Sequence, residues 1–168
     1  MTNPNDDPLP VEVSSPACSM HEADDAYMGY AGKDELIAFL NALLETEDAV
    51  ARVTRESANA AGSGPIADLM AAIQKDEAHF CEILTRHIKV LGAIPSPPVG
   101  VLYGKAMAVP DLRERIAFLS RGQGWVVRKL REILPRVRDN QLHSDLSEML
   151  RSHEANIALA DELAGRAP

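Results

Sequence analysis

Apolar residues recur every three or four positions along four long stretches of the chain, which is the spacing of helices that bury one face. The pattern predicts helices over residues 34–60, 65–91, 110–135 and 140–164. Proline opens the second and third stretches, and glycine follows the first and second, as is usual at helix ends. We therefore predict an all-α fold.

The links between these helices differ in length. The first and second helices, and the third and fourth, are separated by only a few residues, which makes each pair antiparallel neighbours. The second and third are separated by residues 92–109, which are rich in proline and glycine. Eighteen extended residues can span about 50 Å or more, the full length of such helices. The sequence thus predicts an up-down four-helix bundle with one long crossover between the second and third helices.

The N-terminal segment has a different character. Residues 1–32 contain four prolines, many acidic residues and no sustained periodicity. Such a segment cannot bury enough apolar surface to order itself. We therefore expect an acidic, mostly disordered tail over residues 1–32 and a helical domain over residues 33–165.

Each predicted apolar stripe is interrupted near its middle by a polar residue. The four are Glu47, Asp76, Gln123 and His153. In an antiparallel bundle of equal helices the midpoints share one level, so these side chains are expected to meet in the core. His79 and Asn156 each follow one of them by three residues and add a second group on the same side.

A buried carboxylate is costly unless it is paired or bound to a cation. Four polar residues at one level therefore need a shared explanation. They form a hydrogen-bonded cluster, hold a metal ion or line a small polar cavity.

Two segments carry a resemblance to a known family. LNALLETE (40–47) and KDEAHFCEILTRHIKVLGAIPS (75–96) resemble the first and second helices of the ferritin-like superfamily, in particular its bacterioferritin- and rubrerythrin-type bundles. The resemblance covers about residues 34–164 and is weaker in the third and fourth helices. It implies a bacterial branch of that superfamily whose di-iron site is partly lost.

The resemblance assigns roles residue by residue. A di-iron bundle takes a Glu from each of two helices and a Glu-x-x-His pair from each of the other two. Glu47 takes the first-helix position, and Asp76 with His79 takes the second-helix pair. Gln123 replaces the third-helix Glu, and His153 with Asn156 replaces the fourth-helix pair.

The replacement of metal ligands at these positions changes the function that the resemblance implies. The resemblance implies a binding or structural bundle rather than a ferroxidase. One alternative is a metalloprotein or oxidoreductase that holds a single Fe, Zn or Mn ion at Glu47, Asp76, His79 and His153. The other is a helical module that binds a partner. Whether the protein is an enzyme stays open.

Composition and charge narrow the functional classes to which the protein can belong. Apolar residues make up 46% of the 168 residues, aromatic residues 4%, and the net charge is −8, which disfavours a nucleic-acid binder. No apolar run approaches a membrane span, and two cysteines cannot build a disulfide framework, so we expect a cytoplasmic protein. Residues 105–138 carry nine basic and three acidic residues, which we interpret as a solvated basic helix face; a surface that docks an acidic protein partner is the alternative. The family resemblance also implies a homodimer.

Two glycines flank Gln123 in the middle of the third helix. Gly122 and Gly124 each cost about 1 kcal/mol relative to alanine there. We expect close helix packing or a local bulge at this point, and an opening that admits a small molecule to the polar centre is the alternative.

Overall fold

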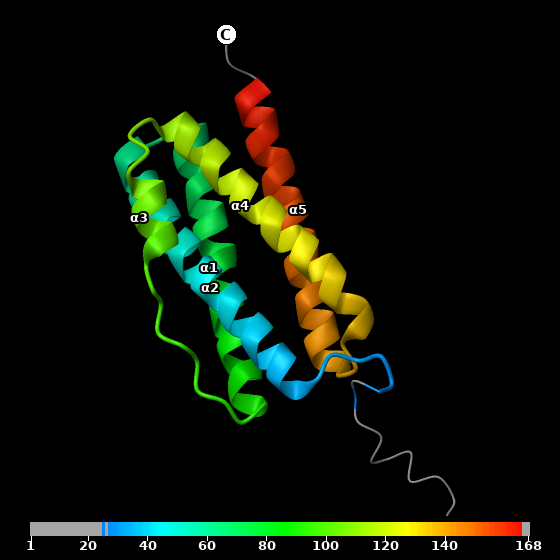
Figure 1. Ribbon diagram of the computed structural model, residues 1–168. Helices are drawn as coiled ribbons and strands as arrows, with labels where there is room; N and C mark the ends of the chain where they lie inside the picture. The colour runs from blue at the N-terminus through cyan, green and yellow to red at the C-terminus, as the bar shows by residue number, and fades with distance from the viewer. Residues whose placement is uncertain (1–24, 26, 166–168) are drawn as a thin grey trace, which may run out of the picture.

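A computed structural model describes residue 25 and residues 27–165 and shows an all-helical protein, as predicted (Figure 1). No strand occurs within these described residues. The elements are α1 (Lys33–Ala61), α2 (Pro65–Val90), α3 (Val101–Met107), α4 (Leu112–Ile133), a 3₁₀ turn η2 (Leu134–Arg136) and α5 (Asn140–Gly165). The predicted disordered tail falls mainly on residues outside the described part of the chain.

Local sequence sets the helix ends close to their predicted positions. Gly62 has a φ of 70° and closes α1, and Gly64 has a φ of 99° just before Pro65 begins α2. Only glycine adopts such left-handed conformations without strain. Asp111 caps α4 by accepting a 2.9 Å hydrogen bond from the amide of Glu114.

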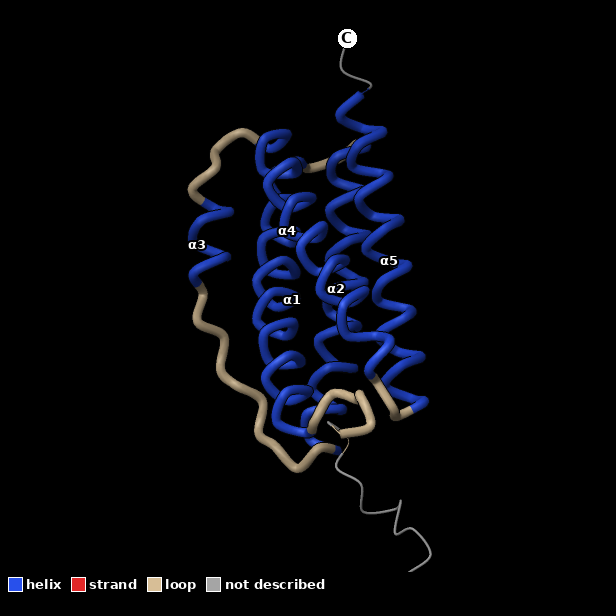
Figure 2. The backbone as a smooth tube through the Cα atoms, turned by 45° about the vertical axis from the view of Figure 1, so that its right-hand side comes forward, coloured by secondary structure: helices blue, strands red, loops and turns tan. Residues whose placement is uncertain are grey.

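The four long helices run in two antiparallel pairs. In Figure 1, α1 runs upward and α2 downward, the connection after α2 returns upward, α4 runs downward and α5 upward. Figure 2 shows the same connection passing along the outside of α1. The segment contains the seven-residue helix α3, which the sequence pattern did not predict because one short helix gives too few repeats of its apolar spacing.

The connection is fastened to α1 by polar contacts. The amide of Ser96 donates to Asn41 Oδ1 at 2.7 Å. Tyr103 donates its hydroxyl to Glu56 Oε1 at 2.6 Å, and the Arg52 guanidinium stacks over the Tyr103 ring, 4.1 Å from its centroid. These contacts hold the segment on the outer face of α1.

The apolar core is divided into two clusters. One takes residues from the N-terminal half of α1, the C-terminal halves of α2 and α4, and the N-terminal half of α5; its fully buried centre contains Leu40, Leu84, Leu130 and Leu146. The other lies toward the opposite ends of the same helices and contains Val53, Met70, Leu119 and Ala160. A band of polar side chains separates the two clusters.

An ionic group centred on the buried Asp145 and His87 ties α2 to α5 beside the first cluster. Asp145 Oδ2 accepts hydrogen bonds from His87 Nε2 at 2.7 Å and Arg86 Nη2 at 2.9 Å, and Asp145 Oδ1 accepts one from Gln141 at 2.9 Å. Burial alone would raise the pKa of Asp145, but the hydrogen bonds from His87, Gln141 and Arg86 outweigh it and hold that pKa below its ordinary value.

We expect Asp145→Asn to lower the free energy of unfolding at pH 7 by about 2 kcal/mol, because it removes charge-assisted hydrogen bonds. A depressed carboxyl pKa stabilises the fold above its unfolded value near pH 4, and this contribution disappears as the pH falls through the folded pKa. Urea unfolding at pH 7 and pH 3 should therefore show a gap between wild type and variant that narrows in acid. The exposed Asp161→Asn serves as control. An equal gap at both pH values would contradict the assignment.

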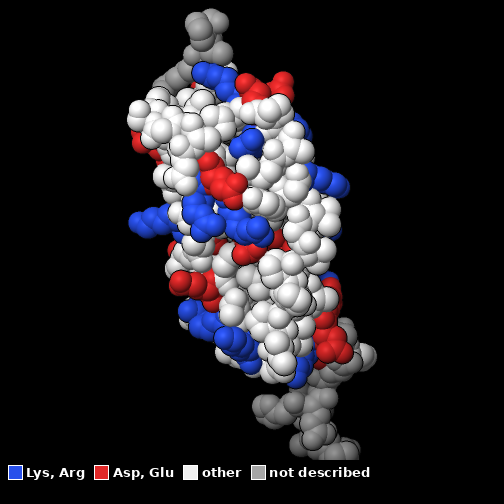
Figure 3. Space-filling view, turned by 90° about the vertical axis from the view of Figure 1, so that its left-hand side faces the viewer, with Lys and Arg blue, Asp and Glu red and all other residues white. Residues whose placement is uncertain are grey.

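The basic residues around α4 are largely engaged within the chain. Arg131 pairs with Glu154, and Arg136 forms a two-pronged pair with Glu35. On the face that carries α3, basic and acidic groups are interspersed (Figure 3). A surface on which charges of both signs alternate is typical of helices that face solvent.

Among the helices of the described residues, none is long and apolar enough to cross a membrane.

Candidate metal centre

The band between the two apolar clusters contains one polar side chain from each long helix. Glu47 lies on α1, Glu77 on α2, Gln123 on α4 and His153 on α5, and their exposed fractions are 1%, 0%, 2% and 1%. On α1, Leu43 belongs to one cluster and Val50 to the other. The four side chains thus share one level at the middle of the core, as the spacing predicts for three of them.

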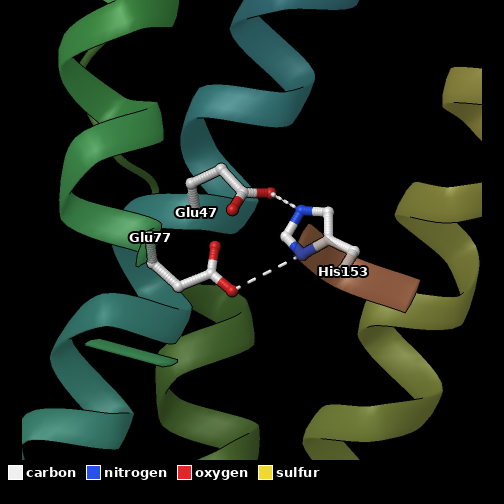
Figure 4. A group of neighbouring side chains, drawn as sticks. All are labelled: Glu47, Glu77 and His153. Carbon is white, nitrogen blue, oxygen red and sulfur yellow. Dashed lines mark ion pairs between the residues drawn. The ribbon is translucent and has the colours of Figure 1, made fainter. Parts of the chain in front are cut away.

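The imidazole of His153 faces both carboxylates, with one ring nitrogen toward each (Figure 4). Its Nε2 is 3.4 Å from Glu47 Oε1, and its Nδ1 is 3.7 Å from Glu77 Oε1. Gln123 donates its amide Nε2 to Glu77 Oε1 at 3.0 Å. Phe80 packs against the imidazole with ring centroids 5.8 Å apart, which closes one side of the group.

Most polar atoms of this group have no hydrogen-bond partner. Within the described residues, both carboxylate oxygens of Glu47, Oε2 of Glu77 and both ring nitrogens of His153 are buried and unsatisfied. The imidazole-to-carboxylate distances are longer than the 2.7–3.2 Å usual for hydrogen bonds. Each unsatisfied buried group costs about 1–3 kcal/mol, and more when it is charged. Leaving five such atoms unsatisfied in one place is therefore costly.

The structure places Glu77, not Asp76, at the α2 position of this layer. Asp76 is only half-buried and accepts hydrogen bonds from Ser152 Oγ at 2.9 Å and Asn156 Nδ2 at 3.2 Å. Asp76 and Asn156 therefore clamp α2 to α5 beside the layer instead of joining it. The signal for Glu77 was present in the sequence, because a residue four after Ile73 and three before Phe80 fits helical spacing as well as Asp76 does.

His79 is also separated from the layer. It lies on the exposed face of α2, and its ring contacts that of Phe80 at 5.6 Å between centroids. A residue two positions after Glu77 points about 200° around the helix from it. Of the predicted ligand set, Glu47 and His153 come together, Gln123 joins them through Glu77, and Asp76 and His79 do not.

The glycines beside Gln123 do not mark close helix packing. A Cβ built on Gly122 meets nothing within 4 Å, and one on Gly124 meets only the flexible end of Arg128, at 3.8 Å. The expectation of close packing is therefore wrong, because a Cβ at either position meets no atom of another helix.

We expect Gly122→Ala to raise the free energy of unfolding by about 1 kcal/mol and the Tm by roughly 2–4 °C, because alanine restricts the unfolded chain and meets no clash. Thermal unfolding followed by circular dichroism measures this shift. Gly62→Ala is the matched control and should destabilise, since Gly62 has a φ of 70°. A loss of stability in Gly122→Ala would show that a neighbour does occupy this space.

Cys81 lies one turn beyond Glu77 but offers no reactive thiolate. Burial, and then the charges of Glu47, Asp48 and Glu82, raise the pKa of its thiol to about 12. A thiol with this pKa is protonated at neutral pH, and the thiolate is the form that attacks electrophiles or binds metals.

The three ionisable side chains of the layer fit a metal ion. Glu47, Glu77 and His153 each offer one ligand atom, and these atoms lie within 4.8 Å of one another. Ligands held at 2.0–2.2 Å by one tetrahedral ion lie roughly 3.4 Å apart, so small side-chain rotations bring them into place. One imidazole nitrogen with carboxylate oxygens is a donor set for Zn²⁺, Fe²⁺ or Mn²⁺.

Comparison with known proteins assigns the chain to a family without describing its chemistry. A family model described as Domain of unknown function (DUF6306) matches residues 34–162, which include every residue of the polar layer. Neither the curated proteins nor the solved structures give a match. Because the family model covers well over half of the sequence, the chain belongs to the DUF6306 family.

Proposed function

We propose that the protein binds one divalent transition-metal ion in its core, held by Glu47, Glu77 and His153. The observation that carries the proposal is the convergence of five buried polar atoms from these residues with no hydrogen-bond partner among the described residues. One ion would satisfy the carboxylate oxygens together with one ring nitrogen of His153. A network of hydrogen bonds would instead place the imidazole closer to both carboxylates than 3.4 and 3.7 Å.

Charge favours one ion over two. Glu47 and Glu77 contribute two negative charges, which balance one divalent ion in a site where net charge is costly. A second divalent ion would lack such balance. At an effective dielectric near 20, each missing carboxylate 4 Å from a divalent ion forfeits about 8 kcal/mol of attraction before desolvation is counted.

The proposal includes a ferritin-like four-helix bundle as the scaffold. The long connection between α2 and α4, the two antiparallel pairs and the inward polar layer support this interpretation. The function proposed is therefore that of a binding protein built on a bundle whose site has been reduced from two ions to one.

This reduced site should not oxidise ferrous iron above the background rate. Gln123, His153 and Asn156 occupy positions where the resemblance expects carboxylates or a histidine, so a second iron lacks ligands. The measurement adds two equivalents of Fe²⁺ per chain without oxygen, admits oxygen and follows the absorbance of ferric products. Rapid oxidation that disappears in Glu47→Ala would contradict the proposal.

Metal binding itself is tested by equilibrium titration. Protein stripped with a chelator is titrated separately with Mn²⁺, Fe²⁺ and Zn²⁺, and one ion per chain is expected. Glu77→Gln should abolish high-affinity binding, whereas Asp76→Asn, one position away but outside the layer, should retain it. Equal binding by both variants, or no binding by wild type, would refute the assignment.

A further inference from the structure

Gln123 is the fourth member of the layer and has a role that the three-ligand site leaves open. Its side chain is 98% buried, and its amide nitrogen lies 3.0 Å from Glu77 Oε1. The amide is thus held against an atom that the proposed ion would contact. Gln123 is also the only layer residue on α4.

An amide can present either of two atoms at this position. The oxygen and nitrogen of a glutamine exchange places by a half-turn of the terminal torsion, with almost no change in shape. With nitrogen inward, Gln123 donates to Glu77, as observed. With oxygen inward, two oxygens would lie about 3 Å apart, which is unfavourable unless a cation lies between them, and is then an ordinary spacing of neighbouring ligands.

We propose that Gln123 supplies the fourth protein ligand through its carbonyl oxygen, so that the ion sits in a closed, structural site that joins all four long helices. This inference rests on the proposed function. Two carboxylates, one imidazole and one amide offer up to six donor atoms, which is enough for tetrahedral Zn²⁺ or octahedral Mn²⁺ without water. Structural metal sites are closed in this way, whereas catalytic sites keep an open position.

Glutamine suits this role better than glutamate. A third carboxylate would give the layer a net negative charge with the ion bound and stronger repulsion without it. The neutral amide suits both the metal-free and the metal-bound protein. It donates a hydrogen bond to Glu77 when the ion is absent, and its oxygen would coordinate the ion when it is present.

The test detects water bound to the ion. Protein loaded with one equivalent of Mn²⁺ in D₂O is examined by pulsed electron paramagnetic resonance, which detects deuterons of water coordinated to the metal. Wild type should show none. Gln123→Leu and the smaller Gln123→Ala should each still bind Mn²⁺, more weakly by at least about 10-fold, the smallest loss typical when a group that only supports a ligand is removed, and the Ala variant should gain a water signal. Asn156→Ala, which lies beside the layer, is the control and should show none.

Each outcome separates the inference from the proposed function. Coordinated water in wild type would overturn the closed site while leaving metal binding intact. An Ala variant that binds Mn²⁺ with unchanged affinity and no water would overturn the role of Gln123. Failure of wild type to bind Mn²⁺, Fe²⁺ or Zn²⁺ in the titration above would overturn the proposed function and this inference with it.

Discussion

Adding a tightly bound divalent ion to the metal-free protein should raise its Tm by roughly 8–16 °C when the free ion is at 1,000 times its Kd. Binding to the folded state alone adds about 4.1 kcal/mol of stability at that ratio. For a chain of this length, each kcal/mol shifts the Tm by roughly 2–4 °C. The increment arises because one ion satisfies up to four buried polar atoms, three carboxylate oxygens and one ring nitrogen, that otherwise have no hydrogen-bond partner within the described residues. Differential scanning calorimetry with and without the ion measures it.

The matched controls are neighbours on α2. Glu77→Gln should lose the increment, because it removes a ligand charge from the layer. Asp76→Asn should lower the starting Tm, since it weakens the contacts with Ser152 and Asn156, yet keep the increment. A Tm that does not respond to any of Mn²⁺, Fe²⁺ or Zn²⁺, or an increment that survives Glu77→Gln, would count against the site.

Replacing the whole layer by leucine should make the metal-free protein more stable, by about 1–4 kcal/mol. The variant carries Glu47→Leu, Glu77→Leu, Gln123→Leu and His153→Leu. Buried charged groups replaced by apolar residues of similar volume often give a gain of this size, because their desolvation penalty is removed. The new side chains would also join the two apolar clusters into one. Urea unfolding in the presence of a chelator measures the difference.

The same variant should show no stabilisation by any metal ion. Wild type loaded with its ion should recover much of the difference in free energy of unfolding, since the ion offsets the desolvation penalty of the polar layer. If the leucine variant is less stable than metal-free wild type, the polar layer stabilises the fold without an ion and is a structural hydrogen-bonded cluster.

The helices and most of the site were predictable because helical periodicity is strong over long segments. Glu47, Gln123 and His153 interrupt apolar stripes, and the structure buries all three at one level. The choice between Asp76 and Glu77 could not be made in this way. Spacings of three and four residues are both helical, so two adjacent polar residues fit the stripe equally well, and only packing against the other helices selects Glu77.

Two other features depend on tertiary geometry that the sequence pattern does not carry. The glycines beside Gln123 suggested close packing, but the neighbouring helices leave Gly122 open. Helix α3 forms where the connection lies on α1, with Tyr103 held by Glu56 and Arg52. A seven-residue helix is marginal alone, so these contacts rather than its own sequence stabilise it.

Anomalous X-ray scattering from crystals grown with Mn²⁺ or Zn²⁺ shows directly whether the polar layer binds one ion. We predict one strong peak per chain, within bonding distance of Glu47, Glu77 and His153 and absent from crystals of Glu77→Gln. Crystals of wild type grown with excess ion that show no peak there, with both carboxylates hydrogen-bonded to ordered water or to the imidazole, would contradict it.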